Sequence, residues 1–269
     1  MDKFADRAPG HALRADTGSG GQEGYLYVPA GGQGPATGAS PGRLIQNKDR
    51  LRPWIVVHHE IESVIPAEWP GSLWRAAVVD AANQKDFDAC GGGRLLPTAP
   101  YTRAVAVRVL SELPIWRIFG GKGEQVLEVV RVAEGLSSSE VDLLASHTEP
   151  GASKCYSKAW SAWLLDSNPD SIYADADHTR TLLAGGSKRR SPINAGFTLI
   201  YSLMAARARQ LGGQSALGAD DEGGERLLGN WAHALSALLH AAMALGAPDY
   251  VSDDERVVLL KPWLALGNG

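Results

Sequence analysis

The chain contains very little cysteine, with only Cys90 and Cys155 among its 269 residues. Two cysteines form at most one disulfide, which excludes the class of small secreted proteins held together by several disulfides. A chain of this length also buries a sizeable core without such cross-links. We therefore interpret both cysteines as reduced thiols of a cytosolic protein.

Long apolar runs are missing as well. Residues 1–7 lack the apolar stretch of a signal peptide. The nearest approach to a membrane span, between Trp231 and Leu245, is interrupted by His233, Ser236 and His240, whereas about 18 consecutive apolar residues are needed. We expect a cytoplasmic location and no membrane partner.

The chain has no large excess of charge of one sign, because 26 Lys and Arg against 30 Asp and Glu leave a formal net charge of -4. Proteins that bind nucleic acid through bulk charge are usually strongly basic, so we do not expect a nucleic-acid partner. The zinc motif His-Glu-x-x-His and paired Cys-x-x-Cys motifs do not occur either. None of the patterns is specific to a known family.

Glycine and proline dominate the first part of the chain. A segment of this composition buries too little apolar area to offset the entropy lost on ordering. We therefore predict that residues 1–45 form a disordered leader, interrupted by one short strand at residues 25–28.

Residues 53–80 show the period of two that is typical of β-strands. Ile55, Val57 and His59 fall on one face, and a second apolar run at residues 73–79 follows the breaker Trp69-Pro70-Gly71. This predicts a β-hairpin or two neighbouring strands. After the flexible Gly91-Gly92-Gly93 the pattern changes, so we place the boundary between the β-containing part and the helical part near residue 95.

Helical periodicity follows from residue 100 onward. Pro100 can start a helix in which Val105, Val109 and Leu110 share one side and which ends at Pro114. Ser137 and Glu140 have the spacing of a capping box at a helix N-terminus. Other helices are expected after Gly120-Gly121 with Gly135 as the stop, around Trp160 and Trp163, at residues 193–211 and 228–242, and after the capping residue Ser252.

Together these patterns predict a mainly α protein. The expected architecture is a compact bundle of about seven helices, preceded by a small β-hairpin element and a disordered Gly/Pro-rich leader. The corresponding segments are residues 1–45 for the leader, residues 46–95 for a β-hairpin-containing segment packed on the helical part, and residues 96–269 for the helical domain.

One candidate metal site lies on the predicted strand. Alternation points His58, Glu60 and Glu62 to the same face, and one imidazole with two carboxylates can hold a divalent metal ion with a position left open for water. Any half-exposed strand also needs a polar face, so a solvated face remains the alternative interpretation.

A candidate phosphate site lies in the basic loop after Gly185 and Gly186. Ser187, Lys188, Arg189 and Arg190 precede a predicted helix, whose N-terminal amides attract anions. If this loop binds a ligand, we expect a nucleotide or phosphorylated metabolite before a nucleic acid. The alternative is a solvated basic loop.

Histidines and acids elsewhere allow two further hypotheses. Asp175, Asp177 and His178 resemble fragments of metal sites, but such residues also start helices. His233 and His240 lie two helical turns apart, so they could act together or could be two satisfied interior histidines.

These patterns lead to two function hypotheses from different classes. We expect a noncatalytic cytoplasmic helical protein that acts through protein–protein interaction, because no strong catalytic motif is present. The alternative is a metal-dependent enzyme with a pocket between the β-hairpin and the helices, acting on a phosphorylated or nucleotide substrate. A divalent metal is the one cofactor that the sequence suggests.

Overall fold

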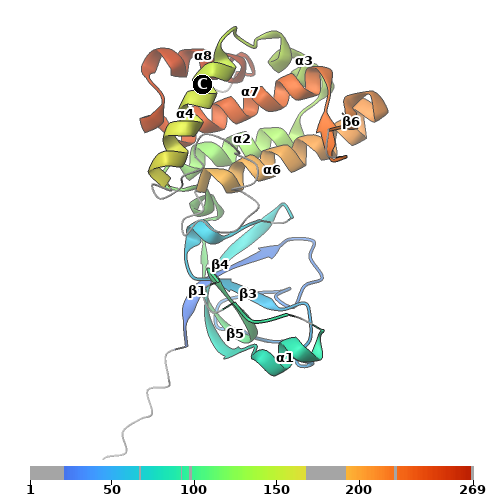
Figure 1. The fold of residues 1–269 in the computed structure, drawn as a ribbon, viewed down its shortest axis with the longest axis vertical. Coiled ribbons are helices and arrows are strands. Elements are labelled where there is room, and N and C mark those ends of the chain that lie inside the picture. Colours follow the sequence, from blue (N-terminus) through green and yellow to red (C-terminus); the bar gives the residue numbers. More distant parts are fainter. Residues whose placement is uncertain are drawn as a thin grey trace, which may run out of the picture.

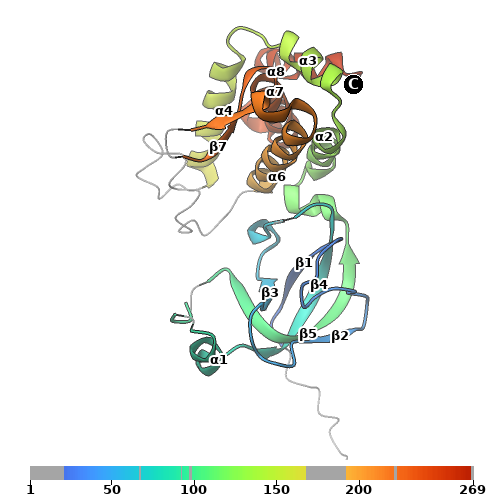
Figure 2. The same ribbon diagram turned by 90° about the vertical axis from the view of Figure 1, so that its right-hand side faces the viewer.

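The computed structural model describes residues 21–66, 68–91, 93–96, 99–167, 192–220 and 223–267. These residues form two lobes, which we call the barrel lobe (residues 21–113) and the helical lobe (residues 123–267) (Figure 1). The 3-10 turn η2 (Ile115–Phe119) carries the chain from the first lobe to the second. The two lobes lie one above the other in both ribbon views (Figures 1 and 2).

The barrel lobe is an antiparallel sheet closed on itself. Its strands are β1 (Glu23–Pro29), β2 (Leu44–Gln46), β3 (Ile55–His58), β4 (Gly71–Ala81) and β5 (Tyr101–Leu113). They follow the order β2-β5-β3-β1-β4, and β4 also pairs with β5. That last pairing closes four strands into a barrel and leaves β2 as an extra strand on β5. The predicted fold class, a helical bundle behind a β-hairpin, is therefore wrong.

β5 makes the closure possible, because it pairs with three other strands. Its first residues pair with β3, the next with β2, and its other edge follows β4. Register shifts in the β4–β5 pairing, at Arg75, Val78 and Asp80, have the effect of β-bulges, which bend and twist a sheet enough to close it. The barrel interior is filled by buried apolar side chains, among them Leu26, Ile45, Ile55, Val57, Trp74, Ala76, Val107 and Val109.

The helix predicted from Pro100 is a strand instead. Val105 and Val109 are four residues apart, which is two repeats of a strand as well as about one helical turn, so the spacing fits both periods. The intervening Val107 is also buried, and β-branched residues favour strands. Strands therefore continue to Leu113, well beyond the predicted boundary near residue 95.

The predicted partnership of the strands at 55–62 and 73–79 is wrong as well. β3 and β4 do not pair with each other, because β1 lies between them and pairs with both. β1 includes the short strand predicted at residues 25–28, which is confirmed. The leader predicted for residues 1–45 thus contains all of β1 and the beginning of β2, and residues 1–20 lie outside the described residues.

A short helix, α1 (Gln84–Ala89), covers one outer part of the barrel. The Asn83 side chain accepts hydrogen bonds from the backbone amides of the first turn. Asp86 accepts one from the backbone amide of Asn83, which completes a capping box. Phe87 of α1 packs with Ala82 and Val105 outside the barrel interior. In both ribbon views α1 lies on the side of the barrel that is remote from the helical lobe (Figures 1 and 2).

The helical lobe confirms most of the helices expected after residue 120. It comprises α2 (Gly123–Gly135), α3 (Ser138–Ser146), α4 (Ala152–Ser167), α6 (Pro192–Arg207), the π-turn η3 (Ala208–Gly212), η4 (Gly213–Ala216), the hairpin β6 (Leu217–Ala219) and β7 (Glu225–Leu227), α7 (Gly229–Gly246), η5 (Pro248–Tyr250) and α8 (Asp253–Ala265). Ser137 and Ser252 form the expected caps. Within the described chain, no helix is both long and apolar enough to cross a bilayer.

The core of the helical lobe surrounds α7, which packs against α2, α3, α4, α6 and α8. Val64 and Leu73 of the barrel lobe belong to the same cluster of buried side chains. The two lobes therefore share an apolar interface and are not connected by a flexible linker alone.

An aromatic cluster connects α4, α6 and α7 inside the helical lobe. Tyr156 lies 5.0 Å from His240 between ring centroids and 6.1 Å from both Trp160 and Phe197. Trp160, Trp163 and Trp231 are buried. Only 4% of His240 is exposed, whereas His233 on the same helix is exposed, so only one of the two histidines is an interior residue.

Candidate ligand-binding site

The residues of the predicted metal site do not continue along one strand face. β3 ends at His58, Glu60 immediately precedes the 3-10 turn η1 (Ile61–Ser63), and Glu62 lies within that turn. His58 is near Ser63, with 3.3 Å between Nδ1 and Oγ. Among the described residues, no group of three or more His, Cys, Asp and Glu side chains is placed to hold a metal ion. The structure gives the strand-face metal prediction no support there.

The other predicted sites fall outside the description. Ser187, Lys188, Arg189 and Arg190 lie in the range 168–191, as do Asp175, Asp177 and His178, and none of these residues is described. The phosphate hypothesis for the basic loop therefore stays a prediction. Cys90 and Cys155 are described, and both are free thiols.

The residues that the structure does bring together lie at the beginning of β5. Arg103 points its guanidinium over two aromatic rings, with 4.9 Å from Cζ to the centroid of Phe87 and 5.3 Å to that of Tyr101. It also donates a hydrogen bond of 3.2 Å to the Tyr101 hydroxyl. Cation–π contacts with two rings fix the orientation of this cation before any ligand arrives.

Trp54 completes an aromatic platform that consists of the rings of Trp54, Phe87 and Tyr101. Its ring stacks on Phe87 with 5.5 Å between centroids and 8° between planes. The indole Nε1 of Trp54 is buried and has no hydrogen-bond partner. A buried donor without an acceptor is costly.

Trp54 and Arg103 line a surface hollow of about 530 Å³ together with Arg52 and Pro53. Arg52 is exposed, and neither Arg52 nor Arg103 forms an ion pair with a carboxylate in the described part of the chain. By contrast, Arg50 and Arg75 of the same lobe are paired with acids. Two uncompensated guanidinium groups thus face one hollow, which is an arrangement suited to an anion.

A second, smaller pocket of about 290 Å³ adjoins the first, because Arg103 lines both. It lies where β1 and β5 begin and β3 and β4 end, and its lining is Gln22, His59, Ala82, Leu95, Leu96, Ala99, Tyr101, Thr102 and Arg103. Its polar groups are connected: His59 Nε2 is 2.8 Å from Thr102 Oγ1, which donates to Gln22 Oε1 at 3.1 Å. Apolar walls with a few converging polar groups at a barrel mouth are typical of ligand sites.

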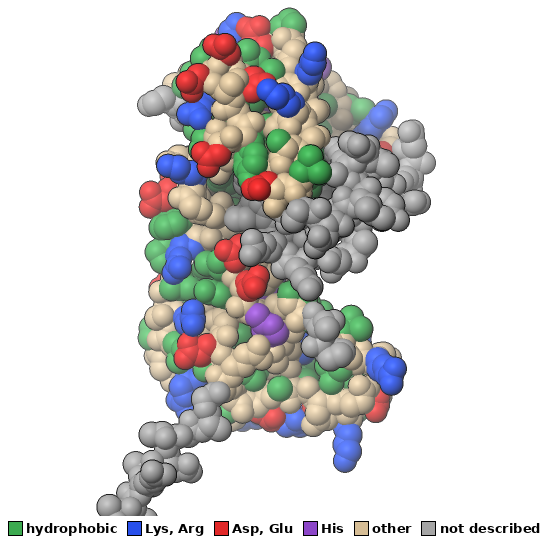
Figure 3. Space-filling model, turned by 60° about the vertical axis from the view of Figure 1, so that its left-hand side comes forward, with side chains coloured by type: hydrophobic (Ala, Val, Ile, Leu, Met, Phe, Trp, Pro, Cys, Tyr) green, Lys and Arg blue, Asp and Glu red, His purple; other side chains and the backbone are tan. Residues whose placement is uncertain are grey.

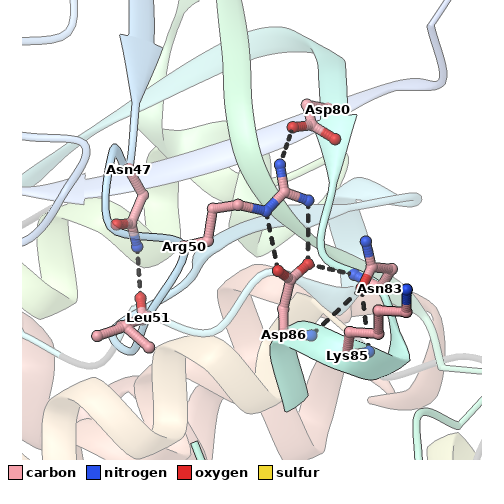
Figure 4. A network of polar contacts seen from close by, with 7 residues as sticks. All are labelled: Asn47, Arg50, Leu51, Asp80, Asn83, Lys85 and Asp86. Atoms are coloured by element: carbon pink, nitrogen blue, oxygen red, sulfur yellow. Dashed lines mark hydrogen bonds and ion pairs between the residues drawn. The ribbon is translucent and has the colours of Figure 1, made fainter. Parts of the chain in front are cut away.

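An ion-pair network holds this platform in place (Figure 4). Arg50 reaches from the loop before β3 to Asp86 of α1, with 2.8 Å from Nε to Oδ1 and 3.1 Å from Nη2 to Oδ2, and its Nη1 is 2.5 Å from Asp80. Hydrogen bonds to Asp86 hold its pKa below the usual range. The larger effect comes from the Arg50 guanidinium and the smaller from the backbone amide of Asn83. The network ties α1, which carries Phe87, to the loop that leads to Trp54.

Sequence reasoning missed Arg52, Trp54 and Arg103, because the two arginines are far apart in the chain. Trp54 did carry a signal, since it directly precedes β3 in the alternation of Val56 and His58, where a large apolar ring is unusual. Gly38-Ala39-Ser40-Pro41-Gly42 does match the Gly-x-Ser-x-Gly spacing, but it lies in the loop between β1 and β2. That context lacks the strand-to-helix turn of a nucleophile elbow.

No protein-family model, no curated protein and no solved structure matches this chain.

Proposed function

We propose that the protein binds a small anionic ligand with an aromatic ring, of which a nucleotide is the simplest example, at the hollow between Arg52, Trp54 and Arg103. The observation that carries the proposal is the pair of unpaired guanidinium groups on one hollow, one of them already held over aromatic rings. The phosphate would bind Arg52 and Arg103, and the ring would lie against Tyr101, which contacts Arg103 and lines the adjoining pocket.

The charge distribution favours a small ligand over a nucleic-acid polymer. Residues 21–113 contain nine Lys and Arg and nine Asp and Glu, so the barrel lobe has a formal net charge of zero. On the face shown in Figure 3, side chains of the two signs are interspersed. Binding of a polymer requires an extended basic surface that contacts several phosphates. Two arginines suffice for one phosphate group.

The first prediction concerns these arginines. Arg103→Gln and Arg52→Gln should each weaken the binding of inosine 5′-monophosphate about 10-fold or more, because each removes a charge-assisted hydrogen bond worth about 1.5–3 kcal/mol. Isothermal titration calorimetry on the full chain, with inorganic phosphate as a second ligand, measures the loss.

Arg108→Gln is the matched control. Arg108 is an exposed arginine of the same strand, about 17 Å further along β5, and it lines neither pocket. Its replacement should leave the affinity unchanged. The proposal fails if the wild-type protein binds neither ligand, or if the Arg103 variant binds as tightly as the Arg108 variant.

A second candidate function is the binding of a partner protein by the helical lobe. The supporting observation is on α8, where Val257 is 69% exposed and Leu264 is 50% exposed, seven residues apart on one face. Lone exposed apolar residues are ordinary, but two on one helical face can anchor a partner.

The second prediction follows from this face. Val257→Glu with Leu264→Glu should abolish association with a protein partner while leaving the melting temperature within a few degrees, because both side chains are largely in water. Chemical cross-linking followed by pull-down compares the variant with the wild type. Identical sets of cross-linked proteins from both would eliminate α8 as the docking face.

A further inference from the structure

The direction of one hydrogen-bond chain in the smaller pocket restricts the ligand further. Thr102 donates its hydroxyl proton to Oε1 of Gln22, an amide oxygen that can only accept. A hydroxyl has one proton, so the Thr102 oxygen must be the acceptor in its 2.8 Å contact with Nε2 of His59. Nε2 therefore carries a proton.

A neutral imidazole has one N–H and one bare nitrogen. With the proton on Nε2, Nδ1 of His59 is an acceptor with a free lone pair. His59 lines the smaller pocket, and Arg103 lines both this pocket and the hollow at Arg52. A ligand anchored at Arg103 by its anionic group can thus extend its other end toward His59.

We infer that the ligand of this site carries an N–H or O–H donor on its ring, which donates to Nδ1 of His59 while its phosphate binds Arg103. This inference rests on the proposed function and names its substrate class: a nucleoside monophosphate whose ring has a protonated nitrogen. Leu95, Ala99 and Tyr101 supply apolar contact for such a ring. A ring that offers only lone pairs would place acceptor against acceptor and leave both unpaired.

A matched pair of ligands tests the inference. Inosine 5′-monophosphate has a ring N–H, whereas purine riboside 5′-monophosphate has the same ribose and phosphate but a ring nitrogen that only accepts. The wild-type protein should bind the first about 10-fold more tightly or better, measured by calorimetry. Equal affinities would overturn the inference.

Variants of the chain separate the role of Thr102 from general damage. Thr102→Val removes the hydroxyl that fixes the His59 proton, so the preference should fall toward equal affinity. Thr198→Val, at an exposed position of α6, is the matched control and should leave both affinities unchanged. A preference that survives in Thr102→Val contradicts the inference.

The failure of this inference can be told apart from the failure of the proposed function. If Arg103→Gln binds both ligands like the wild type, the proposed function is wrong and the inference falls with it. If Arg103→Gln weakens the binding of both ligands equally, but the wild type binds the two ligands with the same affinity, only the inference is wrong. The ¹⁵N chemical shifts of His59 in the ligand-free protein give an independent readout: protonated Nε2 supports the inference, and protonated Nδ1 overturns it.

Discussion

Replacing Gly123 with alanine is expected to lower the free energy of unfolding by about 3 kcal/mol. A Cβ atom at this position would lie 2.0 Å from the carbonyl oxygen of Trp116 and 3.3 Å from Cβ of Phe119. The first contact is with backbone, so no rotation of a side chain relieves it. α2 would have to move away from η2, the segment that joins the two lobes.

Gly121→Ala provides the control two residues earlier. No heavy atom outside its immediate neighbours lies within 4 Å of the added Cβ, and its φ is not in the left-handed region. Its effect should stay within about 0.5 kcal/mol. Urea denaturation followed by circular dichroism compares the two variants. Equal stabilities would show that η2 and α2 do not pack as closely as the structure has them.

The second large effect is a loss of stability in acid that depends on His240. Burial lowers the pKa of this imidazole to about 4, from 6.5 in the unfolded chain. Its ring contacts Tyr156, whose pKa is raised by burial, so this neighbour is a neutral phenol at the pH values concerned. The folded state therefore holds His240 in its neutral form.

The sign of the pH dependence follows from this shift. Above pH 6.5 both states are neutral at His240, and its contribution to stability is fully present. As the pH falls from 6.5 to about 4, the unfolded state takes up a proton that the folded state does not, which costs about 1.4 kcal/mol per pH unit and about 3 kcal/mol in all. Below that range the contribution is lost completely.

His240→Leu isolates this contribution, because carboxylates also titrate in acid. The difference in free energy of unfolding between wild type and variant should shift by about 3 kcal/mol between pH 7 and pH 4, in favour of the variant at low pH. His233→Leu, at an exposed position of the same helix, should show no such shift. A constant difference for the His240 variant would mean that His240 is solvated.

The helical lobe was largely predictable because its signals are local. The capping box of Ser137 with Glu140 and the cap at Ser252 are each contained within four residues, and both are confirmed. Whether a helix begins there depends mainly on orphan amides that the same few side chains satisfy. Distant parts of the chain add little to that decision.

The barrel was not predictable in the same way. The pairing of β1 with β4 joins residues about 50 apart, such as Tyr25 with Arg75, and no local pattern encodes which strand will lie beside which. In β5 the local pattern itself was ambiguous between two periods, and partners on both edges decided the outcome. Arg52, Trp54 and Arg103 meet only because β3 pairs with β5, so the candidate site was hidden for the same reason.

The position of β5 in the chain has a consequence for synthesis on the ribosome. β5 is the last strand of the barrel to be made, and it pairs with three strands that precede it. Until residue 113 has left the exit tunnel, β3 and β4 have open edges and the nascent sheet cannot form a ring. Ring closure then depends on contacts between distant residues, which form slowly. The nascent barrel lobe is thus an incomplete, edge-exposed sheet for the time that the ribosome needs to add β5, and this is the interval in which a chaperone that binds open strands would act on it.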